Sequence, residues 1–364
     1  MYSNFFYSLL KLEVLNLSQN SITAVAEYSF TTLESLKVLN ISGNKITIVY
    51  SYTFYGLGKA QLAELDLSRN LISTIYPIAF SELRNLTLLD LSCNAVPSLT
   101  DVFFLNLISL KTLNLNNNKI DKILPKTFEK LLMLETLDLS NNKISVYNLE
   151  MFGGVKFTGN KLKRIVLSNN RLTTFADNSF SLNLNLITLE ASNNELTKLS
   201  ANLLKTTTKL QKLNLNNNKL TELVKGFLDP LINVQEVYIG YNSMTFLPDV
   251  KNEFLKYIHT SINAPLYHYT TFYFNYRLQK LCIERVPFQC SCYKDLIKWS
   301  RKKKVTLVST TGLALTFNDN MPVCVVTPVR SCVKNVTLSD EFGVAEKYNE
   351  AISLTTLETQ NVHE

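Results

Sequence analysis

The chain has 364 residues, of which 46% are hydrophobic and 18% charged, and this composition excludes an intrinsically disordered protein. The formal net charge of +7 is modest for this length and does not resemble the footprint of a nucleic-acid-binding protein, so no nucleic-acid partner is expected. No apolar run is long enough to predict a transmembrane helix, and residues 1–15 lack the pattern of a signal peptide.

A nine-residue pattern, L-x-x-L-x-L-x-x-N, recurs along most of the chain. Each match predicts a short strand of a parallel sheet, whose leucines at the first, fourth and sixth positions enter a core shared with the next coil. The fold class is therefore an α/β solenoid dominated by a curved parallel sheet. Eleven segments match, at steps of mostly 24 residues, starting at Leu12, Leu36, Leu62, Leu86, Leu110, Leu134, Leu162, Leu186, Leu210, Val234 and Leu255.

Two further ladders follow the same period. The asparagines at the ninth position are expected to satisfy backbone groups of adjacent loops. The aromatic residues ten positions later are expected to fill the wider, convex side of each coil. The asparagines are Asn20, Asn44, Asn70, Asn94, Asn118, Asn142, Asn170, Asn194, Asn218, Asn242 and Asn263. The aromatic series is Phe30, Phe54, Phe80, Phe104, Phe128, Phe152 and Phe180, weakening to Leu204 and Phe227.

The array is irregular at its start and in its middle. The opening stretch "FYSLLKL" already fits the tail of a repeat with no cysteine-bearing cap before it, so we expect the N-terminus to be incomplete. The unit between Asn142 and Leu162 is four residues longer than normal and contains three glycines. That insertion is interpreted as a tolerated bulge on the convex side, with a functional loop as the alternative.

The outward-facing strand residues are the candidate binding surface. The fifth position is monotonous through most of the array and carries little specificity, at Asn16, Asn40, Asp66, Asp90, Asn114 and Asp138. It then changes to Val166, Glu190, Tyr238 and His259. Because amphipathic aromatic side chains are typical of recognition surfaces, we predict a ligand-binding patch at Tyr238, Tyr241, Tyr257 and His259. In the alternative interpretation these aromatics only pack beside the end of the array.

Four cysteines follow the last coil, "LQKLCIERVPFQC". Cys290 and Cys292 are separated by one residue, Cys324 and Cys332 come later, and spacing alone allows three pairings. Zinc is the competing interpretation, but C-x-C followed by two distant cysteines is poor spacing for a metal site. Leu296 and Trp299, three residues apart, would lie on the same face of a helix directed toward the last coil. The "RKKK" stretch at 301–304 would be its solvated C-terminus, favoured by the helix dipole.

Cys93 and Cys282 lie outside this group. Eight strands separate them, which corresponds to roughly 38 Å at about 4.8 Å per strand, so they cannot pair with each other. Each is either a free or buried thiol, or the site of an intermolecular disulfide. Cys282 occupies the fifth position of the last coil, predicted to face outward at the end of the array, and is therefore the preferred candidate for the intermolecular bond.

Four N-x-S/T sequons are candidate glycosylation sites. Asn85 precedes its strand and Asn335 lies after the repeats, whereas Asn16 and Asn40 arise from the repeat consensus and are weaker candidates. With three histidines and no nucleophile, phosphate-binding or metalloprotease motif, no catalytic residue, metal or cofactor is expected.

Together, the repeats and the cysteine-rich end resemble extracellular leucine-rich repeat proteins, in particular Toll-like receptor ectodomains and insect leucine-rich immune proteins. The resemblance implies a leucine-rich repeat horseshoe closed by a disulfide-bonded C-terminal cap, with Cys290 paired to Cys324 and Cys292 to Cys332. It divides the chain into an array at 1–277, a cap at 278–332 and a tail or stalk at 333–364.

The same resemblance implies a secreted or cell-surface recognition scaffold with no enzymatic activity, since disulfides form in oxidising compartments. Its partner would be a protein or a microbial-surface ligand in innate immunity, with a homo- or heterodimer formed through the C-terminal region. The alternatives are a cell-adhesion or guidance receptor and a structural matrix protein. Function in such proteins lies in the variable surfaces rather than in the fold.

Overall fold

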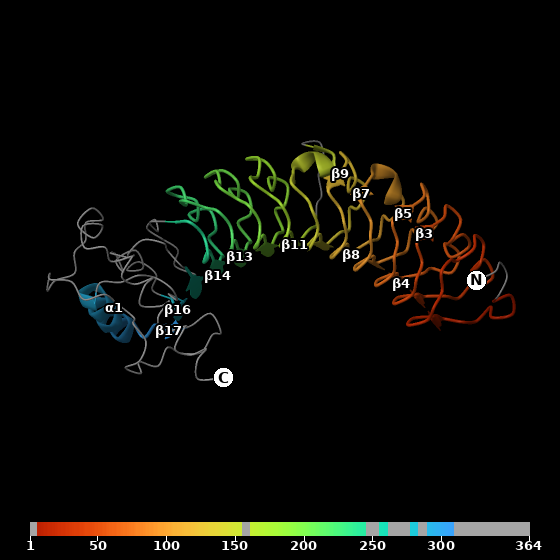
Figure 1. Ribbon diagram of the computed structural model, residues 1–364, viewed down its shortest axis with the longest axis horizontal. Coiled ribbons are helices and arrows are strands. Elements are labelled where there is room, and N and C mark those ends of the chain that lie inside the picture. Colours follow the sequence, from red (N-terminus) through yellow and green to blue (C-terminus); the bar gives the residue numbers. More distant parts are fainter. Residues whose placement is uncertain (1–5, 155–160, 245–254, 261–276, 283–289, 309–364) are drawn as a thin grey trace, which may run out of the picture. The chain divides into compact units, whose positions relative to one another are not determined.

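The computed structural model describes residues 6–154, 161–244, 255–260, 277–282 and 290–308 (Figure 1). The chain divides into two compact units. The first unit comprises residues 1–195 and 202–210, and the second comprises residues 196–201 and 211–364.

The first unit is built on parallel three-residue strands. They are β1 (Val14–Asn16), β2 (Val38–Asn40), β4 (Glu64–Asp66), β6 (Leu88–Asp90), β8 (Thr112–Asn114), β10 (Thr136–Asp138), β11 (Arg164–Val166) and β12 (Thr188–Glu190). Each pairs in register with the next, for example Leu39 with Leu65 and Leu65 with Leu89. The short strands β3 (Ile48–Val49), β5 (Thr74–Ile75), β7 (Ser98–Leu99) and β9 (Lys122–Ile123) pair as β3 with β5 and β7 with β9. They lie along the opposite edge of this unit from β4, β8 and β11 (Figure 1).

The second unit continues the same construction. Its parallel strands are β13 (Lys212–Asn214), β14 (Glu236–Tyr238), β15 (Tyr257–His259), β16 (Lys280–Cys282) and β17 (Thr306–Val308), and its helix is α1 (Cys290–Lys303). All eleven predicted repeat segments therefore carry a strand at their third to fifth positions, and the predicted parallel-sheet solenoid is confirmed.

The repeated leucines form the core, as predicted. The middle residue of each strand points inward, and Leu39, Leu65 and Leu89 are each 0% exposed. Burial of one such side chain contributes about 1.5–3 kcal/mol, but only when the neighbouring coil covers it. This is why the strands can be as short as three residues: the packing between coils, and not the strand itself, supplies the stability.

The phenylalanine ladder is confirmed too. Phe30, Phe54 and Phe80 are at most 1% exposed, and their rings stack at centroid distances of 6.2 and 5.8 Å. In the longer unit after Asn142, the 3-10 helix η2 (Leu149–Phe152) places Phe152 in the ladder, 5.4 Å from the ring of Phe128. A second 3-10 helix, η1 (Asp101–Phe103), precedes Phe104. Residues 155–160 of the insertion lie outside the described part of the chain.

The asparagine ladder works as expected. The Asn142 Nδ2 donates to the carbonyls of Leu115, Leu139 and Ser140 at 3.0, 3.0 and 3.1 Å, and its Oδ1 accepts the Ile120 N–H at 3.0 Å. Two of these four groups belong to the preceding coil. One buried amide therefore connects two coils. The same donation to the preceding coil recurs at Asn44, Asn70, Asn94, Asn118, Asn170, Asn194 and Asn242. Asn20 donates to the Leu17 and Ser18 carbonyls of its own coil.

The eighth position of the repeat has a feature that the sequence pattern did not single out. Its φ angle is positive in ten successive coils, in the left-handed region that glycine and asparagine tolerate best. The occupants are Gln19, Gly43, Arg69, Cys93, Asn117, Asn141, Asn169, Asn193, Asn217 and Tyr241. The run of asparagines in the middle of the array follows from this backbone requirement.

The end of the array differs from the prediction in one respect. Strand β16 was expected to be the last, but β17 pairs with it, so that Cys282 and Val308 are register partners. Leu296 and Trp299 of α1 are 0% and 5% exposed, which confirms that they share a buried face of a helix.

Several predictions lie outside what the structure describes. Residues 324, 332 and 335 are outside the described ranges, and the side chains of Cys290 and Cys292 are not described, so the two cap disulfides remain predictions. The same holds for the boundaries at 277 and 332. Within the described residues, no helix is long and apolar enough to cross a membrane.

Candidate functional site

The four residues predicted to form a binding patch come together in the second unit. Tyr238 ends β14, Tyr257 and His259 begin and end β15, and Tyr241 occupies the left-handed position just after β14. The ring of Tyr238 lies 5.0 Å from that of Tyr257 and 6.4 Å from that of His259, and the ring of Tyr241 lies 5.5 Å from His259. We call these four residues the aromatic patch.

The patch has two layers. The three tyrosines are half-buried, whereas His259 is only 4% exposed. His259 was expected to face outward with them, and that expectation is wrong. The imidazole instead forms the base on which Tyr238 and Tyr241 pack edge-on.

Two residues that the sequence analysis missed hold His259 in place. Its Nδ1 lies 3.0 Å from Nδ2 of Asn216, whose Oδ1 also accepts the Gly240 N–H at 2.7 Å. A Cβ at Gly240 would lie 2.6 Å from Cε1 and Nε2 of the imidazole, so only glycine leaves room for this ring. The signal was present in the sequence, because the seventh position is Ser or Asn in the nine preceding repeats and Gly only at 240.

Charged groups border the tyrosines. The Lys212 ammonium lies 5.3 Å from the centre of the Tyr238 ring, and the Tyr238 hydroxyl donates to Glu236 Oε2 at 3.2 Å. Burial raises the pKa of Tyr257, and the neighbouring Cys282 thiol and Tyr238 hydroxyl raise it further. The Tyr257 phenol, whose pKa is raised, therefore stays a neutral hydrogen-bonding group at physiological pH. A surface of this kind, with aromatic faces, hydroxyls and one charge of each sign at its border, suits contact with another protein.

The predicted outward orientation of Cys282 is wrong. The residue is 0% exposed and interacts with Tyr257 beneath the aromatic patch, between β15 and β17. An intermolecular disulfide at Cys282 therefore loses the geometric reason for which it was preferred. Cys93 is half-buried in the first unit, where its Sγ accepts a hydrogen bond from Asn117 Nδ2 at 3.3 Å.

The fifth-position residues of the first unit have a structural role. Asn40, Asp66 and Asp90 each accept the backbone N–H two residues ahead at 2.8–2.9 Å, which turns the chain out of the strand. The change of pattern at Val166 and Glu190 produces buried side chains, each 7% exposed, rather than an exposed recognition surface. Among the described fifth-position residues that are neither Asn nor Asp, Tyr238 alone is not buried.

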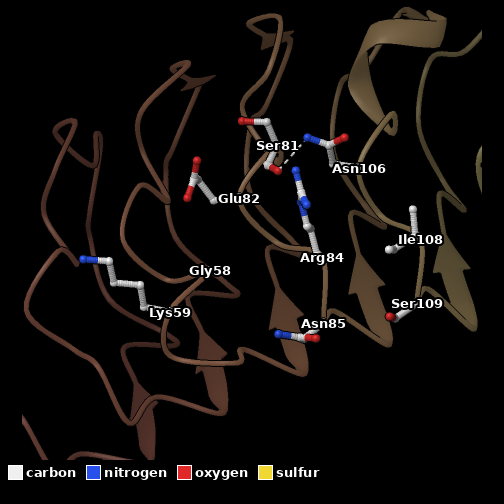
Figure 2. A pocket seen from close by; sticks show the side chains of 9 residues that line it. All are labelled: Gly58, Lys59, Ser81, Glu82, Arg84, Asn85, Asn106, Ile108 and Ser109. Carbon is white, nitrogen blue, oxygen red and sulfur yellow. Dashed lines mark hydrogen bonds between the residues drawn. The ribbon is translucent and has the colours of Figure 1, made fainter.

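The described glycosylation candidates differ in their surroundings. Asn85 is exposed and lines a hollow of about 500 Å³ in the first unit, together with Lys59, Arg84 and Asn106 (Figure 2). Figure 2 shows Arg84 in the middle of this hollow and Asn85 at its lower edge, near the strands. Asn16 and Asn40 lie within strands, and their Oδ1 atoms accept the N–H groups of Ser18 and Ser42.

A second aromatic surface, in the first unit, also escaped the sequence analysis. Tyr28, Tyr52 and Tyr55 are 40–45% exposed, with the Tyr28 and Tyr52 rings stacked at 5.5 Å and Tyr55 edge-on to both. Burial, together with Tyr52, Glu27 and Tyr55, raises the pKa of Tyr28. These tyrosines lie in the loops after the strands, so the strand-based search could not find them.

No group of histidine, cysteine and carboxylate side chains suited to a metal ion occurs among the described residues.

Comparisons with known proteins agree with the repeat structure. The leucine rich repeat family model matches residues 10–61, 51–96, 84–144 and 108–156, and a second Leucine Rich Repeat model matches residues 209–231. No curated protein sequence matches the chain.

Solved structures share the fold at low sequence identity. A chain of the Drosophila Toll–Spatzle complex matches with a TM-score of 0.67 and 21% identity, over 78% of this chain and 39% of that chain. A leucine-rich repeat protein of Leptospira interrogans matches with a TM-score of 0.63 and 20% identity, over 83% and 85%. A chain of the octameric complex of Latrophilin 3, Unc5D and FLRT2 matches with a TM-score of 0.52 and 24% identity, over 64% and 69%. This chain thus spans well under half the length of the matched chain of the Toll–Spatzle complex. The strands, the asparagine ladder and the family models together identify the chain as a leucine-rich repeat protein.

Proposed function

We propose that the chain is an extracellular, non-enzymatic recognition scaffold that binds a protein ligand through the aromatic patch. The observation that carries the proposal is the packing of Tyr238 and Tyr241 on a buried His259, with Tyr257 against Tyr238. Tyrosines held by a fixed base lose little conformational entropy on binding, and such aromatic residues dominate the energetics of protein interfaces.

The backbone at Tyr241 supports a binding role. Its φ of 54° lies in the left-handed region, where a bulky side chain costs about 1–2 kcal/mol and where five of the preceding repeats carry Asn. Strained residues tend to persist where function needs them. A tyrosine in place of the better-tolerated asparagine is therefore expected to serve contact with a partner rather than folding.

The proposal is tested with variants that remove the aromatic surface but preserve the fold. Tyr241→Asn restores the usual residue of the array, and Tyr238→Ala with Tyr257→Ala removes the two stacked rings. Tyr76→Ala is the matched control, because Tyr76 is 45% exposed and belongs to the first unit, whereas the patch belongs to the second. Each protein is applied to a panel of extracellular proteins displayed on cells, and its affinity for any ligand found is measured by surface plasmon resonance.

Binding that falls about tenfold or more in the patch variants, and stays unchanged in the control, supports the proposal, since truncation of a central aromatic residue costs about 2 kcal/mol or more. Equal affinity of all variants would remove the patch as the binding surface. In that case the aromatics only pack beside the end of the array.

The biological setting is proposed as innate immunity. The Toll–Spatzle complex, which shares the fold, is described as a molecular hub in Drosophila development and innate immunity. Binding of the purified chain to microbial cells, with loss in the patch variants, supports this setting. Cell aggregation driven by the surface-displayed chain would favour the adhesion alternative, for which the complex of Latrophilin 3, Unc5D and FLRT2 is the structural parallel.

A further inference from the structure

The second unit carries a concentrated positive charge that the overall composition conceals. Between Lys294 and Lys304 the chain has six basic residues and one acidic residue, a formal charge of +5, whereas the whole chain has +7. The six basic side chains are all exposed. Most of the excess charge of the protein is thus confined to α1 and the residue after it.

Four of these residues form one stripe along α1. Lys294, Lys298, Arg301 and Lys302 are spaced by one and two helical turns, so they share a face about 12 Å long. Among the described residues, no carboxylate forms an ion pair with any of the four. We call these four residues the basic stripe.

The opposite face of α1 is buried. Leu296, Trp299 and Ser300 are 0%, 5% and 5% exposed, and α1 contacts β17. A helix that lies on a membrane needs an apolar face to insert among the lipids, and the apolar face of α1 is already occupied by the protein. The stripe therefore offers charge alone, which suits a water-soluble polyanion better than a bilayer.

The end of the helix gives a second, independent observation. Val305 N–H bonds to the Ser300 carbonyl at 2.9 Å and Lys304 N–H to the Arg301 carbonyl at 3.3 Å, with Lys304 at a φ of 57°. This is a Schellman cap, in which the left-handed residue is usually glycine. The chain keeps a lysine there at a conformational cost, as it keeps Tyr241 in the aromatic patch, and strained residues are often functional.

We propose that the basic stripe binds a sulfated polysaccharide. A linear polymer with regularly spaced sulfates matches a linear row of cations repeated at each helical turn, and clusters of basic residues are a known feature of heparin-binding segments. The biological setting rests on the extracellular location in the proposed function, but the binding chemistry does not depend on the aromatic patch.

The test measures the affinity of the purified full chain for immobilised heparin at about 0.15 M NaCl. The stripe variant carries Lys294→Gln, Lys298→Gln, Arg301→Gln and Lys302→Gln. The matched control removes the same charge from scattered exposed sites, by Lys45→Gln, Lys119→Gln, Lys205→Gln and Lys225→Gln. Lys304 lies beside the stripe and outside the helix, so Lys304→Gly should raise the melting temperature by relaxing the backbone and weaken heparin binding less than the stripe variant does.

We expect the stripe variant to bind heparin about tenfold more weakly or worse, because four ionic contacts are lost, and the control to bind like the wild type. Desulfated heparin should not bind. A variant with Tyr238→Ala and Tyr257→Ala should keep heparin affinity, which separates this site from the aromatic patch.

Three results would overturn the proposal. The first is passage of the wild type through a heparin column at that salt concentration without retention. The second is a loss of heparin affinity in the scattered control as large as in the stripe variant. The third is stripe-dependent binding to phosphatidylserine vesicles with unchanged heparin affinity, which would assign the stripe to a membrane.

Discussion

The asparagine ladder allows a sharp test, because replacing Asn142 by Asp changes one amide into a carboxyl of the same shape. The Oδ1 that accepts the Ile120 N–H is retained. The Nδ2 that donates to three backbone carbonyls at 3.0, 3.0 and 3.1 Å becomes an oxygen. The two N–H hydrogens of Asn142 are shared among the three carbonyls, and the neutral acid offers one O–H, so one donor is lost. At about 0.5–1.5 kcal/mol for a hydrogen bond, the neutral variant loses about 1 kcal/mol of unfolding free energy.

Ionisation makes the loss larger. A carboxylate facing three carbonyl oxygens in a buried site has its pKa raised above the unfolded value of about 3.9. Because the folded pKa is the higher one, the stability of the variant is greatest at low pH and falls as pH rises between the two pKa values. For a shift of about three units, the deficit relative to wild type grows by about 2–3 kcal/mol between pH 5 and pH 8.

The assay is urea unfolding followed by circular dichroism at both pH values, with wild type measured alongside. Asn141→Asp is the matched control, because the neighbouring Asn141 is exposed and its substitution should change the unfolding free energy by less than about 0.5 kcal/mol at either pH. A deficit for Asn142→Asp that does not grow with pH would refute the hydrogen-bond assignment.

Three other predictions follow from single contacts. Gly240→Ser, which introduces the usual residue of the repeat, should displace the His259 ring and lower both stability and ligand affinity; an unchanged histidine NMR signal would contradict this. Tyr147→Phe should stabilise the protein by about 1 kcal/mol in thermal unfolding, because the buried Tyr147 hydroxyl has no hydrogen-bond partner among the described residues. In protein from a secretory host, peptide mapping should find a glycan at Asn85 that Asn85→Gln removes, whereas Asn40→Gln leaves the glycan mass unchanged.

Local side-chain chemistry explains where prediction from the sequence succeeded. The leucine, asparagine and phenylalanine ladders each repeat at a fixed spacing, and each position meets the same neighbour in every coil. Leu39, Asn142 and Phe54 therefore behave as their positions predict. The residues proposed for the aromatic patch do lie together, as with Tyr238 and Tyr257, while their binding of a ligand stays a prediction.

Prediction was wrong where the environment of a position changes along the array. His259 and Cys282 occupy the same repeat position as the half-buried Asn40, yet both are buried, since their neighbouring strands carry large side chains and β17 follows β16. The space for His259 depends on Gly240, which belongs to the preceding repeat. Such compensation between coils does not show in the pattern of either coil alone.

The sequence by itself determined the solenoid, its repeat spacing and its core, because each coil buries its side chains against a copy of the same pattern. The tertiary structure decided which exposed residues meet. It packed Tyr238 and Tyr241 on a buried histidine, buried Cys282 where it interacts with Tyr257, and set four basic side chains on the exposed face of α1. These contacts depend on distances between coils and on the direction of each helix face, which a one-dimensional pattern does not contain.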